Sequence, residues 1–169
     1  MQVALFSLLS VTLLVSALAD WRSRLIPDVV LAPTLVLGLG LRFVFEGVGD
    51  LEEGVASGLA AAAGCGLLFG AVAWFNKGFG LGDVKLMMVV GACLGVSLGA
   101  AALLFTTIAG ALQAVLVVIW QGAGRETVDR ILRPQSNSSA TRRHIPYGVA
   151  IAVGSAWAMW WAHGNVSGN

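Results

Sequence analysis

The sequence predicts an all-α integral membrane protein, a polytopic bundle of about six transmembrane helices. Of the 169 residues, 57% are hydrophobic and only 11% are charged, and the mean hydropathy is +0.84. Because a soluble domain carries about 25% charged residues, a soluble enzyme is excluded. Each span needs about 20 apolar residues, so six spans use about 120 and leave no room for a second domain. We therefore expect one membrane-embedded domain over residues 1–169.

Charged and turn residues divide the chain into six apolar segments, each expected to form one helix. They cover residues 2–19, 29–45, 54–75, 84–97, 100–120 and 146–163. The end of the first segment resembles a signal-peptide cleavage site, but residues 1–19 contain no Lys or Arg, which favours a retained helix. Glycines at four-residue spacing in the third and fourth segments favour close helix packing. The stretch 95–99 fits either a tight connection or one of the flanking helices.

The basic residues indicate how the helices are oriented. With six crossings, both termini lie on one side, and the connections 20–28, 76–83 and 121–145 lie on the other. Nine of the ten Lys and Arg residues fall in or beside those connections, and only Arg42 lies near the opposite face. By the positive-inside rule, the basic side is cytoplasmic. The sequence therefore predicts a multi-pass protein with both termini outside.

Charge and cysteine content exclude two further classes of function. Ten basic residues against nine acidic ones provide no basic face for nucleic-acid binding. Cys65 and Cys93 lie in apolar runs and form no CxxC pair, which excludes a zinc ribbon or a CxxC redox centre. We interpret both cysteines as small packing residues.

Two acids stand where an apolar segment meets the cytoplasmic face. Asp20 ends the first segment and Asp83 opens the fourth, and ionisable groups at membrane depth usually serve chemistry, a pathway or a partner. If these helices pack together, the two carboxyl groups share a proton. The ionised one then activates a water as general base, and the protonated one polarises the scissile carbonyl. Asp20 and Asp83 are thus the candidate catalytic pair of an aspartic hydrolase, which needs no metal and no cofactor.

The second acid follows alternating glycines in the string GFGLGD. Gly80 and Gly82 permit an unwound backbone, at which an extended substrate segment would pair as a strand pairs at a sheet edge. The alternative is that the glycines form a turn and Asp83 only caps the fourth helix. Asp20 has an alternative as well, as an interfacial partner of the arginines that follow it.

Three segments together resemble the signatures of the prepilin peptidases, polytopic aspartic proteases of the GxGD type. They are DWRSRLIPD at 20–28, GLGDVKLM at 80–87 and IPYG at 145–148. In that family the first catalytic aspartate is followed, seven residues on, by Pro and then Asn or Asp, which Pro27 and Asp28 match. The second is the Asp of GxGD, followed by x-Lys, which Asp83 and Lys85 match. Val149 stands where the third signature often has another proline.

The resemblance implies an aspartic endopeptidase that removes the basic leader of prepilins or pseudopilins at the cytoplasmic face of the bacterial inner membrane. The expected partners are that substrate, membrane lipid and components of pilus or secretion assembly. Longer family members carry an insertion with paired cysteines and also methylate the new N-terminus. The chain has no CxxC and resembles the short, peptidase-only members, including those of Flp-type tight-adherence pilus systems, so no methyl transfer is predicted.

Seven residues around the two acids are candidates for substrate binding or support: Pro27, Asp28, Gly80, Gly82, Lys85, Pro146 and Tyr147. Lys85 either favours the ionised form of the pair, holds a substrate carboxylate or is a snorkelling lysine. Asp28 either attracts the basic leader or is ordinary loop charge. Pro146 and Tyr147 either shape the cleft or start the last helix.

Three other functions compete with this interpretation. A presenilin-like or signal-peptide-peptidase-like protease also uses GLGD, but such proteins are larger and place the first acid in a different context. A small membrane transporter or proton-relay protein would use the same acids as relay groups. It is expected to place acids nearer the membrane centre and to have repeated halves with broken helices, and the sequence shows neither. The third is a non-catalytic membrane subunit of a secretion machine.

Overall fold

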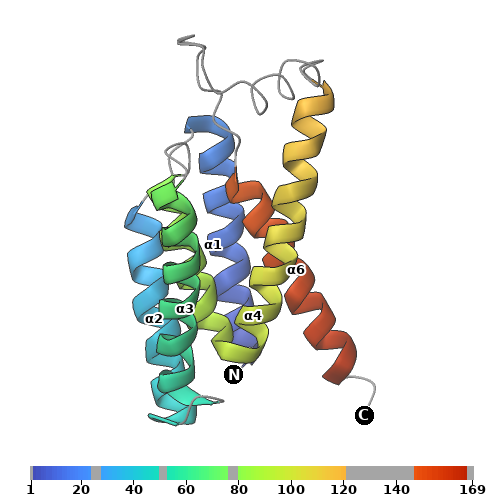
Figure 1. The fold of residues 1–169 in the computed structure, drawn as a ribbon. Coiled ribbons are helices and arrows are strands. Elements are labelled where there is room, and N and C mark those ends of the chain that lie inside the picture. Colours follow the sequence, from blue (N-terminus) through green and yellow to red (C-terminus); the bar gives the residue numbers. More distant parts are fainter. Residues whose placement is uncertain (1, 24–27, 50–52, 76–79, 121–146, 167–169) are drawn as a thin grey trace.

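Five helices make up the part of the chain that the computed structural model describes, which is residues 2–23, 28–49, 53–75, 80–120 and 147–166. They are α1 (Gln2–Ser23), α2 (Asp28–Glu46), α3 (Gly54–Phe75), α4 (Leu81–Trp120) and α6 (Tyr147–Val166). These ranges contain no strand, and the helices pack side by side as a bundle (Figure 1). The all-α prediction is confirmed.

Four stretches within the described ranges are long and apolar enough to cross a membrane. They are Gln2–Asp20, Asp28–Glu46, Gly54–Phe75 and Leu81–Leu116, and a shorter apolar stretch covers Gly148–Ala162. The first three agree with the expected segments to within a few residues. The expected total of six spans stays a prediction.

The long helix α4 reverses direction at Gly95, which has non-helical backbone angles of φ 75° and ψ −175°. A Cβ atom placed on Gly99 would lie only 3.6 Å from the Cα atom of Gly91. Eight residues of continuous helix would instead rise about 12 Å. The limbs 81–94 and 96–120 therefore form a helical hairpin, whose second limb rises away from the turn in Figure 1. They correspond to the fourth and fifth expected segments.

Side chains from α2 and α3 satisfy the backbone groups that this reversal releases. Arg42 Nη2 donates to the carbonyl oxygen of Cys93 at 3.3 Å, and Ser57 Oγ accepts the N–H of Val96 at 3.1 Å. The Arg42 side chain is buried and forms an ion pair with Glu46 at 3.1 Å. Since unpaired backbone groups are costly where water is absent, these contacts stabilise the hairpin.

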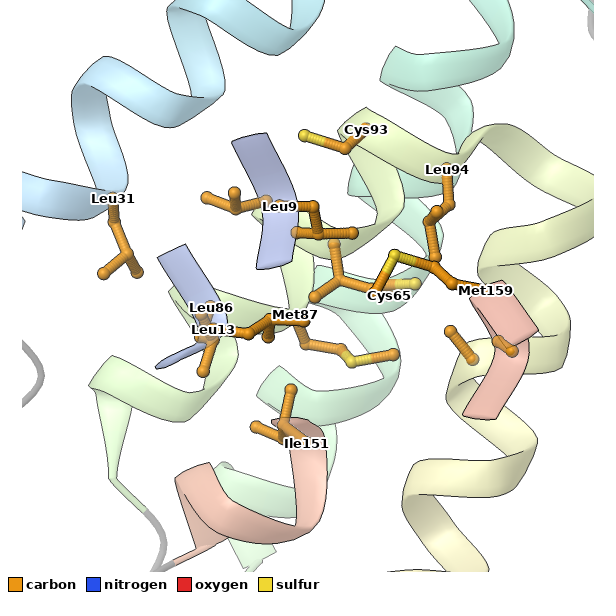
Figure 2. Close-up of a cluster of buried hydrophobic side chains, with 14 residues drawn as sticks. Leu9, Leu13, Leu31, Cys65, Leu86, Met87, Cys93, Leu94, Ile151 and Met159 are labelled. Atoms are coloured by element: carbon orange, nitrogen blue, oxygen red, sulfur yellow. The ribbon is translucent and has the colours of Figure 1, made fainter. Parts of the chain in front are cut away.

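A hydrophobic cluster joins all five described helices and contains both cysteines (Figure 2). Its labelled members are Leu9, Leu13, Leu31, Cys65, Leu86, Met87, Cys93, Leu94, Ile151 and Met159. Both cysteines are buried free thiols, which confirms their interpretation as packing residues. Leu13 lies two turns before Asp20 and Leu86 lies one turn after Asp83, so this core fixes the helices that carry the two acids.

Candidate active site

The two acids predicted to form a pair are both buried within the bundle. Asp20 lies in the last turn of α1 and Asp83 is the third residue of α4, and each is only 7% exposed. Their carboxyl groups are close enough to interact electrostatically. Two carboxyl groups in one partly dry site are suited to sharing a proton and activating a water.

The backbone of Gly80 holds Asp83 at the start of α4. The N–H of Asp83 donates to the carbonyl oxygen of Gly80 at 3.1 Å, and a backbone hydrogen bond links Gly80 to the Asp83 carboxyl group. The bond to the carboxyl group is one half of a capping box, in which the side chain of the third helical residue reaches back to the residue before the helix. Asp83 therefore caps α4 and also interacts electrostatically with Asp20, so the two alternatives for this residue do not exclude each other.

The expected unwound backbone does not extend to Gly82. Because the bonds between Gly80 and Asp83 close the first helical turn, α4 begins at Leu81 and Gly82 is helical. Gly80 precedes the helix, and residues 76–79 lie outside the described residues. Among the described glycines of this motif, Gly80 is the one that lies outside the helix and binds an acid.

The carboxyl group of Asp20 is held by a residue from the other end of the chain. The N–H of Gly148, the second residue of α6, donates to Asp20 Oδ2 at 3.0 Å. Figure 1 shows that α1 ends and α6 begins toward the same end of the bundle. The expected alternative partner does not apply to Arg22, because no ion pair joins it to Asp20 within the described ranges.

Lys85 and Asp28, which were expected to act separately, form an ion pair with each other. Lys85 Nζ lies 2.5 Å from Asp28 Oδ2, and the two side chains are 51% and 64% exposed. The pair joins the first residue of α2 to the fifth residue of α4, two residues from Asp83. An exposed pair of this kind contributes little to folding stability, so its position beside the acids is its notable property.

Several predicted residues lie outside the described residues. These are Pro27, Pro146, the Tyr147 side chain and the connection 121–145 with its basic residues. Among the described residues, no group of three or more His, Cys, Asp or Glu side chains gathers as a metal site would require.

Sequence reasoning missed the role of one residue, Gly148. It belongs to the IPYG string, but its contact with Asp20 spans 128 positions. The available signal for this role was its place directly after Pro146 and Tyr147, where a helix was expected to begin. The first N–H groups of a helix have no acceptor within the helix and bind acceptors outside it.

Comparisons with known proteins identify the family to which the chain is similar. Residues 7–115, which include Asp20 and Asp83, match the model of a family described as the type IV leader peptidase family. Over 146 residues the chain is 33% identical to the prepilin leader peptidase/N-methyltransferase of Bacillus subtilis (strain 168), an alignment that covers 86% of the chain and 51% of that protein. The chain thus spans about half the length of this curated relative. No solved structure matches the chain.

Proposed function

The chain belongs to the type IV leader peptidase family, and on that basis we propose that it is a membrane aspartic endopeptidase that removes the basic leader of prepilins or pseudopilins. One observation carries the proposal. Asp20 and Asp83 come from helices far apart in the sequence, yet both are buried and their carboxyl groups interact. The name of the Bacillus subtilis relative supports the choice of substrate.

The proposed chemistry is general acid–base hydrolysis by the two carboxyl groups. With one proton shared between them, the ionised group takes a proton from water as the water attacks the scissile carbonyl. The protonated group polarises that carbonyl and then supplies a proton to the leaving amine. Substrate and water would complete the site between α1 and α4.

The family implies the substrate class, and the position of the acids along their helices is compatible with it. Both stand at helix ends, beside connections that the sequence predicts to be cytoplasmic. A prepilin with a basic leader in the cytoplasm and an apolar helix in the membrane would present its junction at this depth. We propose pilus or secretion assembly components as further partners, and surrounding lipid as the medium.

Peptide hydrolysis without methyl transfer is the activity that we propose. The sequence has two cysteines and no CxxC pair, whereas the longer, two-activity members of the family that it resembles carry paired cysteines.

Pro27, Gly82, Pro146 and Tyr147 remain candidates for shaping the substrate cleft.

The transporter alternative gains one observation from the structure, because α4 is broken at Gly95. Broken helices in transporters expose backbone groups to a transported ion. Here the released groups of Cys93 and Val96 are bound by Arg42 and Ser57 instead. The break therefore supports a packed hairpin better than an ion path.

Substituting each acid tests the peptidase proposal directly. Asp20→Asn and Asp83→Asn should each abolish leader removal from a co-expressed prepilin, because an amide cannot share or accept the catalytic proton. Leader removal is measured as the mass shift of the pilin, and the mass of the new N-terminus also reports any methyl group. Glu53→Gln, at an exposed position, is the matched control and should cleave normally.

Full cleavage by either single variant would refute the catalytic pair. Ion flux through proteoliposomes that depends on both acids, without any cleavage, would favour the transporter. Loss of pilus assembly with normal cleavage would favour a non-catalytic subunit.

A further inference from the structure

We propose that Gly148 is a positioning residue for the peptidase reaction, holding the Asp20 carboxyl group in the orientation that catalysis needs. This inference rests on the proposed function and adds a third helix, α6, to a site otherwise built from α1 and α4. It combines a hydrogen bond with a steric restriction at the same position.

The hydrogen bond fixes one oxygen of Asp20. The N–H of Gly148 donates to Oδ2 at 3.0 Å in a buried environment. Since α6 begins at Tyr147, this N–H is among the first four of the helix, which have no partner within the helix itself. Asp20 thus supplies from α1 the acceptor that α6 lacks. With Oδ2 held in this way, Oδ1 is the oxygen that remains to act on water.

The steric restriction explains why position 148 is a glycine. A Cβ atom at Gly148 would lie 2.8 Å from Oδ2, 3.1 Å from Cβ and 3.2 Å from Cγ of Asp20. All three of its nearest neighbours belong to the carboxylate side chain. An added methyl group would therefore push against the Asp20 side chain, and the reactive oxygen would move away from its partner.

Two other glycines of α6 provide matched controls. A Cβ at Gly154 would meet the backbone and side chain of Thr106 on α4, whereas a Cβ at Gly164 would meet nothing within 4 Å. Gly148→Ala thus tests the contact with the carboxylate, and Gly154→Ala tests the packing of α6 on α4. Gly164→Ala tests a position where the added methyl group meets no neighbour.

Steady-state kinetics on a prepilin substrate in detergent test the positioning role. Gly148→Ala should lower kcat by about 100-fold, the cost of a displacement near 1 Å of a reacting group, with KM nearly unchanged. Gly154→Ala should lower the Tm. Gly164→Ala should change neither the kcat nor the Tm. A kcat for Gly148→Ala within about twofold of the parent, or a raised KM with normal kcat, would overturn the proposal.

A thermal-unfolding cycle tests the contact without using peptidase activity. Gly148→Ala should lower the Tm in the parent protein and lower it less in the Asp20→Ala background, where the Oδ2 and Cγ atoms that obstruct the new methyl group are absent and only the Asp20 Cβ remains. If Gly148→Ala fails to accumulate, the double variant should restore folded protein. Equal effects in both backgrounds, or no restoration, would overturn the contact. If Gly148→Ala has different effects in the two backgrounds but the parent protein cleaves no prepilin, the contact is supported and the proposed function is refuted.

Discussion

The ion pair between Asp28 and Lys85 is a residue-scale feature whose value lies in its position. Both side chains are more than half exposed, so the pair contributes at most about 1 kcal/mol to folding stability. It nevertheless ties the start of α2 to the turn of α4 that carries Asp83. We therefore expect its effect to appear in activity more than in the Tm.

Charge exchange tests this view. Asp28→Lys or Lys85→Asp alone places like charges together and should lower kcat/KM about fivefold, the equivalent of about 1 kcal/mol. The double exchange Asp28→Lys with Lys85→Asp restores the attraction and should restore kcat/KM. If the double variant is as impaired as the single ones, the two charges act on the substrate separately and do not act as a bridge.

The residues of the site were predictable to different degrees. Asp20 and Asp83 stand out because an acid at the end of an apolar run needs an explanation. Their proximity was inferred from the family resemblance as well as from helix packing. The contacts of Gly148 with Asp20 and of Lys85 with Asp28 could not be assigned. The first is a hydrogen bond that spans 128 positions, and the second is an ion pair that spans 57. The local patterns of a single sequence do not specify which residues meet across such separations. The position of Gly148 at an expected helix start indicated only that its N–H lacks a partner within the helix.

The hairpin of α4 leads to a prediction at the scale of a single element. Gly95→Ala places a side chain where φ is 75°, and its Cβ would lie 2.8 Å from Arg42 Nη2 and 2.9 Å from Ser57 Oγ. Backbone in this region costs a residue other than glycine on the order of 1–3 kcal/mol. We expect a clearly lower Tm in detergent, measured by thermal unfolding.

Gly64→Ala on α3 is the control, since a Cβ there would meet nothing within 4 Å. It should unfold at the parent temperature. If Gly95→Ala proves as stable as Gly64→Ala, the chain does not depend on a glycine to reverse at this point.

The sequence predicted the helices more accurately than it predicted this turn. The expected segment 54–75 coincides with α3, and 29–45 differs from α2 by one residue at each end, because charged and turn residues bound the apolar runs. Gly91, Gly95 and Gly99 have the same four-residue spacing, so no local property selects one of them. The turn occurs at Gly95 because Arg42 and Ser57, from two other helices, bind the backbone beside it.

The orientation of the whole molecule in the membrane is a further prediction. The basic connections indicate that Arg22 faces the cytoplasm and that Glu53 faces the outside. Both positions are exposed in the structure. In intact cells, a membrane-impermeant maleimide should therefore label Glu53→Cys at once and Arg22→Cys only after the membrane is permeabilised.

The parent protein is its own control in this experiment, because Cys65 and Cys93 are only 4% and 1% exposed and should not react. The reverse labelling pattern would invert the orientation. Labelling of both positions from the outside would contradict a crossing between them in α2.

The hydrogen bond between Gly148 and Asp20 also bears on how the protein is made. A ribosome completes α1 and α4, with both acids, before it reaches α6. Until the last helix has been inserted, Asp20 lacks the backbone donor that orients it. If Asp20 and Asp83 are the catalytic pair proposed above, the order of synthesis would delay the onset of proteolysis until α6 is in place.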